Sequence, residues 1–339
     1  MRVMEMRDGW GLEHIKPGTR PERKPGPGEV LIKMAAASVN YRDFVMTRRG
    51  YGPLSGQLPL IPLSDGAGTV VETGPSVTRV KLGDLVCPAF AQFWISGPMK
   101  EERRAGTLGG PLDGVMQEFM VLSEQGVVKA PAHFSALEAA TLPCAALTAW
   151  SAVIGAGTKA GDVVVTQGTC GVSLFALMFA KLHGAMAAIT SSSDDKLARA
   201  RSLGADLCIN YRAHPEWSRE LRKALGGRGA DLIVELGGAE SLDQSLRAIR
   251  TSGTLAMIGV LSGATAQLNL GRVVTQNVRL QGVTLGSRDM FEDMVRAIEQ
   301  HRLAPTIDDR RYAFEQVAEA IGALPGGRHF GKICIDFQT

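Results

Sequence analysis

One glycine-rich segment constrains this chain more than any other, because it lies between an apolar run and a helical pattern. Gly168-Thr169-Cys170-Gly171-Val172-Ser173 follows Val163-Val164-Val165 and opens a helical stretch from Leu174 to Leu182. A strand, a tight turn and a helix N-terminus aim unpaired N–H groups and the positive end of the helix dipole at one spot, which favours a phosphate group. Glycine serves a plain strand-to-helix turn equally well, so the segment by itself leaves both interpretations open.

The residues that follow predict a parallel sheet with helices on both faces. Short apolar runs that read as strands alternate with helical patterns, one of which covers Asp194 to Ser202, and the runs are Ala187–Thr190, Leu207–Asn210, Asp231–Glu235 and Thr254–Gly259. Such alternation is typical of an α/β fold with a doubly wound parallel (Rossmann) sheet, whose ligand lies at the carboxyl ends of the strands. The expected ligand at the glycine-rich turn is therefore the pyrophosphate of a dinucleotide.

The end of the second predicted strand indicates which dinucleotide is preferred. Folds that prefer NAD place Asp or Glu there, roughly 20 residues after the glycines, to bind the ribose 2′-hydroxyl. Here the sequence has Thr190-Ser191-Ser192-Ser193, the first carboxylate is Asp194, Lys196 follows, and Tyr211-Arg212 follow the third strand. Hydroxyls and cations suit a 2′-phosphate, so we expect NADP(H). The alternative is that the serines cap a helix and Lys196 is a solvated surface charge.

Composition excludes several classes of protein. The 339 residues are 45% hydrophobic, enough for two domains with cores, and the net charge of +3 comes without the basic, aromatic-rich patch that nucleic-acid binding would need. The longest apolar run, Leu174 to Ala180, is too short to span a bilayer, and the N-terminal residues are too charged for a signal peptide. From these features we expect no membrane and no nucleic-acid partner. Five scattered cysteines form no disulfide framework, which suits the reducing cytoplasm, so we expect a cytoplasmic protein.

Residues 25 to 130 have a different pattern, in which short apolar runs alternate with turns. The predicted strands Val30–Met34, Gly68–Glu72 and Asp84–Val86 are bounded by glycine and proline turns, which indicates a compact β-rich domain. Beyond the parallel sheet, a helical pattern from Met290 and the segment His329–Ile335 are expected to fold back on that domain.

The chain resembles the medium-chain dehydrogenase/reductase family. The resemblance covers nearly the whole chain and rests on Pro27-Gly28-Glu29-Val30, Asn40-Tyr41-Arg42-Asp43, Asp65-Gly66-Ala67-Gly68, Gly83-Asp84 and Gln167-Gly168-Thr169. It implies a GroES-like substrate domain from residues 1–122 and 287–339 and a Rossmann NADP(H)-binding domain from 123–286. Within the superfamily the chain is most similar to the zinc-independent, quinone-oxidoreductase-like branch, through Asn40–Asp43 and the segments Ser191-Ser192 and Tyr211-Arg212.

The resemblance also addresses the metal. Zinc alcohol dehydrogenases of the superfamily use a Cys, a His and a second Cys where this chain has Asn40, Ser64 and Cys144, and the four cysteines of their structural zinc have no counterpart in residues 90–116. A catalytic zinc normally takes three protein ligands, so we expect no metal. Asp43 and Asp65 are then remnants of the second layer around that site, and Cys144 is expected to be a buried thiol beside the nicotinamide.

The same resemblance implies the coenzyme contacts and the assembly. Thr148 matches a residue that flanks the nicotinamide, and the remaining predicted contacts are Gly168, Thr169, Cys170, Gly171, Val172, Ser191, Ser192, Lys196, Tyr211, Gly237, Gly259 and Leu285. The strand-like segment Arg279–Leu285 can present a sheet edge to a symmetry mate, so a homodimer is expected.

Without a Lewis acid the enzyme cannot readily ionise an alcohol, whereas hydride can add to a quinone or an α,β-unsaturated carbonyl if the carbonyl oxygen is hydrogen-bonded. The small-molecule substrate is expected to belong to these classes, with Asn40 as the donor to the oxygen and Arg42 near a developing enolate or paired with Asp43. Tyr51 resembles the proton donor of enoyl-thioester reductases in this branch, and its alternative is a turn aromatic with its hydroxyl in water.

Three alternatives stay open at this stage. The first is an enoyl-thioester reductase, with Arg48-Arg49 or Arg103-Arg104 as a basic rim for phosphates. The second is a zinc-type alcohol dehydrogenase. The third is a non-enzymatic nucleotide-binding protein, which some members of the branch have become. The structure of residues 90 to 114, which contain Phe93, Trp94 and several glycines, also stays open between a substrate lid and an Ω-loop.

Overall fold

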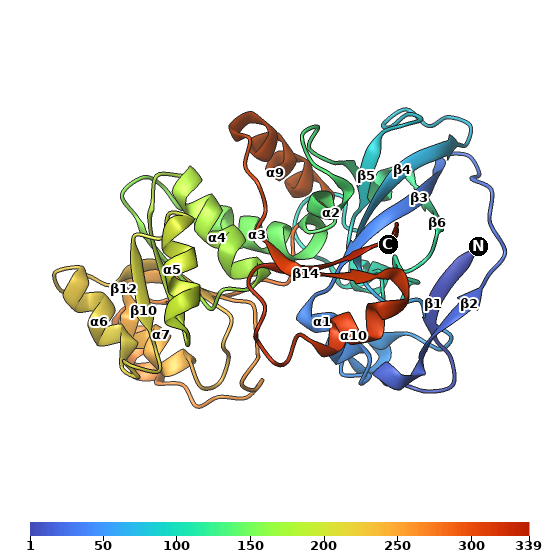
Figure 1. The fold of residues 1–339 in the computed structure, drawn as a ribbon. Coiled ribbons are helices and arrows are strands. Elements are labelled where there is room, and N and C mark those ends of the chain that lie inside the picture. The colour runs from blue at the N-terminus through green and yellow to red at the C-terminus, as the bar shows by residue number, and fades with distance from the viewer. Residues whose placement is uncertain (339) are drawn as a thin grey trace. The chain divides into compact units, whose positions relative to one another are not determined.

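The structure, a computed structural model, describes residues 1–338 and divides the chain into two compact units (Figure 1). The first unit contains Met1–Leu147 and the chain from Gly286 onward, and the second is Thr148–Leu285. We expected the first boundary at 122/123, whereas it lies between Leu147 and Thr148. The physical reason is strand pairing, because β7 (Val127–Lys129) pairs with β5 (Leu85–Pro88) in a sheet of the first unit.

The second unit is built on a six-stranded sheet in which every strand is parallel to its neighbours. Its order is β10-β9-β8-β11-β12-β13. The strands are β8 (Val163–Gln167), β9 (Met186–Ser191), β10 (Leu207–Asn210), β11 (Ala230–Glu235), β12 (Ile249–Met257) and β13 (Arg279–Gly282). The order reverses between β8 and β11, which creates a crevice at the carboxyl ends of these two strands. The predicted α/β doubly wound class is confirmed.

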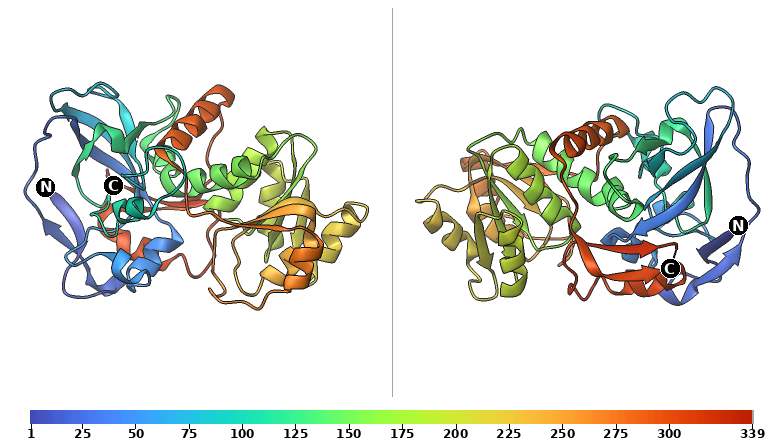
Figure 2. Two further views of the ribbon diagram at one scale, coloured as in Figure 1. Left: turned by 180° about the vertical axis from the view of Figure 1, so that it is seen from behind. Right: turned by 45° about the horizontal axis from the view of Figure 1, so that its top comes forward.

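Helices cover both faces of this sheet (Figures 1 and 2). On one face, Trp217 and Leu221 of α6 and Leu242 and Leu246 of α7 share a hydrophobic core with the sheet residue Ile233. On the other face lie α4 and α5 (Figure 1). The helices of this unit are α4 (Gly171–Leu182), α5 (Asp194–Ser202), α6 (Trp217–Ala224), α7 (Leu242–Ala248) and α8 (Leu270–Thr275), and α3 (Leu147–Gly155) begins at its boundary.

The first unit is β-rich, as expected, but two of its strands are longer than the short runs seen in the sequence. Its large sheet has the order β14-β15-β3-β4-β5-β7, with β6 also paired to β3, and β1 and β2 form a separate antiparallel pair. The remaining strands are β1 (Arg2–Met6), β2 (Ile15–Thr19), β3 (Glu29–Ser38), β4 (Asp65–Thr73), β6 (Phe119–Ser123), β14 (Ile307–Ala313) and β15 (Lys332–Asp336).

The end of the chain returns to this unit, as the sequence predicted. β15 pairs antiparallel with β3, so the last strand lies beside one of the first (Figure 2). The helices here are α1 (Tyr41–Met46), α2 (Ala136–Ala139), α9 (Arg288–His301) and α10 (Val317–Gly322), with a π-helical turn η5 (Leu142–Ala146) and the 3-10 turns η1 (Leu12–His14), η2 (Gly52–Ser55), η3 (Glu101–Gly106), η4 (Glu124–Gly126) and η6 (Phe314–Gln316).

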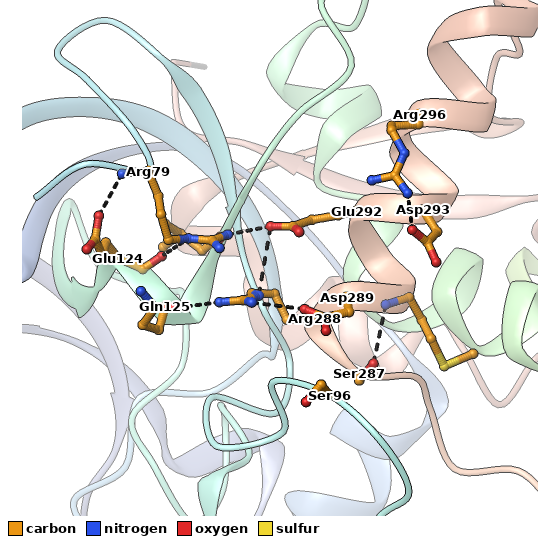
Figure 3. A network of polar contacts seen from close by, with 12 residues as sticks. Arg79, Ser96, Glu124, Gln125, Ser287, Arg288, Asp289, Glu292, Asp293 and Arg296 are labelled. Carbon is orange, nitrogen blue, oxygen red and sulfur yellow. Dashed lines mark hydrogen bonds and ion pairs between the residues drawn. The ribbon is translucent and has the colours of Figure 1, made fainter.

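A polar network fastens the start of α9 to the β-rich core (Figure 3). Arg79 forms an ion pair with Glu292, and Arg288 donates to the side chain of Gln125. The backbone N–H of Arg288 donates to the Trp94 carbonyl at 2.9 Å. These contacts attach the returning chain and also fix one end of the segment 90–114.

One helical stretch, Ala136–Gly155, is long and apolar enough to cross a bilayer. The protein buries 72% of its apolar window, which is typical of a core helix.

Candidate functional site

The glycine-rich turn lies at the carboxyl end of β8 and opens α4, as predicted. Gly168 has φ +76°, and a Cβ there would meet only the Ser173 hydroxyl at 3.9 Å, so the turn is open. Cys170 is the N-cap of α4, and its side chain makes no capping hydrogen bond. The first-turn N–H groups of Gly171 and Val172 are therefore suited to an anion. Thr169, in the same turn, is buried, and its contact with a pyrophosphate stays a prediction.

The residues predicted at the adenosine ribose also come together. Ser191 is the last residue of β9, and its carbonyl accepts a hydrogen bond from the Tyr211 N–H at 3.0 Å. Ser193 caps α5 by accepting from the Lys196 N–H at 3.4 Å, which is the capping role that the sequence offered as an alternative. Capping by Ser193 still leaves the hydroxyls of Ser191 and Ser192 at the strand end. Asp194 accepts a hydrogen bond from Asn210 at 2.8 Å.

A buried polar network that the sequence analysis missed connects the ends of β8 and β11. The Gln167 amide donates to Glu235 at 2.8 Å and accepts from the Leu236 N–H at 3.1 Å. Ser241 and Ser245 also donate to the Glu235 carboxylate, which is only 1% exposed. The signal was available, because Gln167 and Glu235 each end an apolar strand. The network fixes the loop beside the crevice.

Gly237 and Gly259 lie in this region, and packing explains both glycines. A Cβ on Gly237 would approach the Ser241 hydroxyl to 2.3 Å, and one on Gly259 would approach the Leu236 carbonyl to 2.1 Å. The Gly237 carbonyl already accepts from the Ser262 N–H and hydroxyl, each at 2.8 Å. Coenzyme contacts of these two glycines stay predictions.

Two further predicted contacts adjoin each other in the second unit. The buried Thr148 donates its hydroxyl to the Thr284 carbonyl at 3.5 Å, and Leu285 is the next residue.

In the first unit, Asn40 is the N-cap of helix α1 and Arg42 lies in its first turn. The Asn40 N–H donates to the Asp43 carboxylate at 2.7 Å, which stabilises the first turn. Asp43 is only 2% exposed. Burial raises the pKa of Asp43 to about 6, although Arg42 and the Asn40 N–H act in the opposite direction.

Beside Asn40 lies a buried pair of opposite charges. Lys332 is 3% exposed, and its ammonium donates to the Val39 carbonyl at 2.9 Å and to Asn40 Oδ1 at 2.6 Å. Its Nζ is 3.8 Å from Asp65 Oδ2. Asp65 is fully buried, and burial raises its pKa, while Lys332 lowers it. The sequence analysis missed Lys332, although a lysine within the apolar run Phe330–Ile335 was a visible signal.

The Asp65 carboxylate links two of the positions where relatives bind zinc. The Ser64 hydroxyl donates to Asp65 Oδ1 at 2.7 Å, and the Cys144 N–H donates to Oδ2 at 3.0 Å. Cys144 lies in the π-helical turn η5, and burial, with Asp65 adding to it, raises the pKa of its thiol to about 12. The thiol is therefore protonated near neutral pH.

This donor set does not fit a zinc ion. A zinc site needs three good protein ligands, whereas the three positions here have an amide, a hydroxyl and a single thiol, and a buried ammonium is hydrogen-bonded to the amide. Residues 1–338 contain no group of three or more His, Cys, Asp or Glu side chains arranged for a metal.

Arg42 has a mainly structural environment. Its guanidinium lies 3.5 Å from Asp43, donates to the carbonyls of Leu108 and Gly110 at 3.0 and 3.3 Å, and stacks over Phe90 at 4.5 Å. Of the two roles that we considered, the structure therefore favours pairing with Asp43. Arg42 also fastens the segment 90–114, which Trp94 anchors by burial in the core.

Tyr51 precedes the turn η2 and is 45% exposed. The protein around its hydroxyl raises its pKa, through burial first and then through Cys144 and Asp43, whereas Arg42 lowers it. Its hydroxyl therefore stays protonated near neutral pH.

Comparison with known families decides the relationship. The model for the alcohol dehydrogenase GroES-like domain matches residues 26–132, and the model for the zinc-binding dehydrogenase domain matches residues 171–300. The chain belongs to the medium-chain dehydrogenase/reductase superfamily. The resemblance seen in the sequence is thereby confirmed, and the protein is an oxidoreductase.

Curated relatives cover most of the chain. A zinc-type alcohol dehydrogenase-like protein of Schizosaccharomyces pombe is 39% identical over 333 residues, which is 96% of both chains. A 2-methylene-furan-3-one reductase of Solanum lycopersicum is 29% identical and aligns with 91% of this chain and 71% of its own length.

Solved structures agree with the fold. A putative alcohol dehydrogenase from Sinorhizobium meliloti 1021 is 41% identical with a TM-score of 0.92, covering 99% of this chain and 98% of that one. An NAD-dependent alcohol dehydrogenase is 32% identical with a TM-score of 0.88, covering 99% of each chain. The Escherichia coli quinone oxidoreductase complexed with NADPH has a TM-score of 0.83, covering 99% of this chain and 100% of that one, and at 20% identity it supports the fold alone.

Proposed function

We propose that this oxidoreductase is zinc-independent and uses NADPH to reduce quinones or α,β-unsaturated carbonyl compounds. The observation that carries the proposal is the donor set at Asn40, Ser64 and Cys144, where the Lys332 ammonium is hydrogen-bonded to Asn40. Such a site offers hydrogen bonds and positive charge to a carbonyl oxygen. It lacks the ligands for the metal that would ionise an alcohol.

NADPH, when bound, would supply a hydride, and the protein would orient the electrophile and handle one proton. Asn40 would donate its side-chain amide to the carbonyl oxygen. Tyr51 would protonate the α-carbon of an enone, because its hydroxyl stays protonated near neutral pH and interacts electrostatically with Arg42 and Asp43, which lie on the helix that Asn40 caps. A quinone would depend less on Tyr51, since a hydroquinone oxygen can take its proton from water.

The preference for NADPH over NADH is part of the proposal. Ser191 and Ser192 at the end of β9 and Lys196 in the first turn of α5 suit a 2′-phosphate, and Asp194 is hydrogen-bonded to Asn210. The NAD-dependent alcohol dehydrogenase among the similar structures supports a nicotinamide coenzyme.

Relatives favour two substrate classes. The tomato relative is a reductase of a methylene-furanone, which is a conjugated carbonyl compound, and this supports the proposal. The fission-yeast relative is named as a zinc-type alcohol dehydrogenase-like protein, which makes alcohol oxidation the second candidate. That second candidate requires a metal that the donor set here does not fit.

An enoyl-thioester reductase receives less support from the surface arginines. Arg103 donates to the carbonyls of Ser96 and Pro98, and Arg104 pairs with Glu101 at 2.9 Å. The guanidinium of Arg48 stacks over Phe44 at 4.1 Å. These arginines already have partners within the first unit, so the phosphates of a thioester substrate would have to compete with those partners.

A substrate panel tests the proposal. Purified protein with NADPH is assayed with an enone, a quinone and the matching enoyl-thioester, and with NADP⁺ and simple alcohols, each with and without a strong chelator. We expect turnover of the enone and quinone that the chelator does not change. Tyr51→Phe should slow the enone by about 10²–10⁴-fold with unchanged NADPH affinity, and slow the quinone less.

Tyr41→Phe is the matched control, since Tyr41 is a comparably exposed tyrosine on α1 that contacts Phe44. It should keep wild-type turnover. Efficient alcohol oxidation that is lost in chelator and restored by zinc would overturn the proposal. Wild-type enone turnover in Tyr51→Phe would remove Tyr51 from the mechanism and leave the reductase proposal standing.

A further inference from the structure

Lys332 fixes the orientation of the Asn40 amide. An ammonium has only donors, so the Asn40 atom that faces it at 2.6 Å must be the oxygen Oδ1. The Asn40 backbone is fixed as well, because its N–H donates to Asp43 at 2.7 Å. Because the side-chain oxygen and the backbone N–H of Asn40 are both held by hydrogen bonds, the side chain keeps one conformation, and its –NH₂ group therefore has a fixed orientation.

That –NH₂ group is a buried donor without a hydrogen bond of 3.5 Å or less among residues 1–338. The amide is close enough to Asp65 to lower the pKa of that carboxyl, yet the contact does not meet hydrogen-bond geometry. A buried donor without an acceptor is unfavourable. An oxygen atom of a bound ligand would remove this cost.

We propose that Lys332 is the positioning residue of the reduction: it orients Asn40 so that Nδ2 donates to the substrate carbonyl oxygen. This inference rests on the proposed function. Arg42 cannot take the same role, because its guanidinium is bonded to carbonyls of the segment 90–114. A preorganised donor favours the oxyanion that develops on the carbonyl oxygen.

A double-mutant cycle tests whether Lys332 acts through Asn40. Lys332→Met and Asn40→Ala should each lower kcat for an enone by about 10²-fold, which is the loss typical of one oxyanion donor. The kcat of the double variant should be at most a few-fold lower than that of Asn40→Ala, because no Asn40 amide remains for the lysine to orient. Multiplied losses of about 10⁴-fold would overturn the proposal.

A second variant separates orientation from folding. Lys332→Met leaves Asp65 buried without its counter-ion and will be less stable, so Lys332→Met/Asp65→Asn removes both charges. Thermal stability should return while kcat stays low. Recovery of wild-type kcat would show that Lys332 serves only as the counter-ion of Asp65. Ile333→Val, a neighbouring and equally buried residue of β15, is the control and should keep wild-type kcat.

Two further measurements cover cases in which the variants above fail. The first serves if Lys332→Met does not fold, and the second serves if no substrate is turned over. Asn40→Asp keeps an acceptor for the lysine but loses the donor, so it should fold and lose turnover to the same extent as Asn40→Ala. The ¹⁵N-labelled side-chain amide of Asn40 should give a solvent-protected pair of proton resonances, which Lys332→Met/Asp65→Asn should lose. A protected pair without any reductase activity would reject only the proposed function, and an unchanged pair in the variant would reject the positioning role.

Discussion

At the scale of single residues, the most informative feature is a group of buried charges that neutralise one another. Asp43 and Asp65 carry two negative charges, and Arg42 and Lys332 carry two positive ones. The nitrogen–oxygen distances are long, at 3.5 Å for Arg42–Asp43 and 3.8 Å for Lys332–Asp65. The effect of burial on each carboxyl therefore exceeds the attraction of its cation, and the pKa of both carboxyls is raised. Such pairs contribute little to stability compared with apolar packing, which is consistent with a functional role.

The pKa of Asp43 leads to a prediction about stability. Its folded-state pKa of about 6 exceeds the value of about 4 in an unfolded chain. Between about pH 4 and pH 6 the folded protein therefore binds more protons, and the free energy of unfolding falls as pH rises, by at most about 3 kcal/mol. In Asp43→Asn this fall should be missing, as urea unfolding from pH 4 to pH 8 would reveal.

Asp84→Asn is the matched control with the opposite sign. Hydrogen bonds from Lys129 and the Lys81 N–H lower the pKa of Asp84 despite the cost of its partial burial. Its contribution to stability is present above the unfolded pKa and is lost as pH falls, so Asp84→Asn should be less stable than the wild type at neutral pH. If wild type and Asp43→Asn show the same pH dependence, Asp43 is not the titrating group.

At the scale of elements, the junction of β9 and α5 determines how the adenosine end of a coenzyme would be bound. β9 ends at Ser191, Ser193 caps α5, and the Asp194 carboxylate at the start of that helix is hydrogen-bonded to Asn210 at the end of β10. A carboxylate bonded to Asn210 is less available to a ribose hydroxyl. In the proposed NADPH complex, this junction would contact the 2′-phosphate through the serine hydroxyls and the first turn of α5.

We expect NADPH to bind more tightly than NADH, with Lys196 and Tyr211 at the 2′-phosphate. A charge-assisted contact contributes about 1.5–3 kcal/mol, so Lys196→Ala should weaken NADPH by roughly one to two orders of magnitude and leave NADH nearly unchanged. Coenzyme fluorescence titration measures both constants. Arg201→Ala, an exposed residue of the same helix, controls for the loss of one positive charge. Equal losses for both coenzymes would mean that Lys196 is structural.

At the scale of the whole molecule, β13 is the terminal strand of the parallel sheet and pairs only with β12. Several apolar side chains before and within α8 are exposed, among them Val260 at 58%, Leu270 at 67% and Val274 at 73%. An unpaired edge next to exposed apolar residues is a hazard for a monomer. We therefore keep the prediction of a homodimer formed through Arg279–Leu285.

Gly282 allows a direct test of that dimer. A Cβ at Gly282 would meet nothing within 4 Å in the single chain, so Gly282→Asp should fold normally while it places a charge on the edge of β13. We expect sedimentation to give a dimer mass for the wild type at micromolar concentration and a monomer mass for the variant. Ala213→Asp, after the opposite edge strand β10, should remain dimeric. A wild type that is strictly monomeric would contradict the prediction.

Local patterns in the sequence were enough to predict the fold class and the glycine-rich turn after β8. The strand Leu207–Asn210 and the helix Asp194–Ser202 were predicted with the bounds that the structure has, because apolar runs and helical periodicity are local properties. The turn from Gly168 was found in the same way, since a strand, a turn and a helix follow one another along the chain.

Tertiary structure alone decided the chemistry of the first unit. Asn40 and Lys332 are 292 residues apart, and they meet because β15 pairs with β3, which no local pattern encodes. The same applies to Gln167 and Glu235, which adjacent parallel strands bring to one crevice. A buried charge is stable only beside a partner, and long-range strand pairing determines which residues become partners.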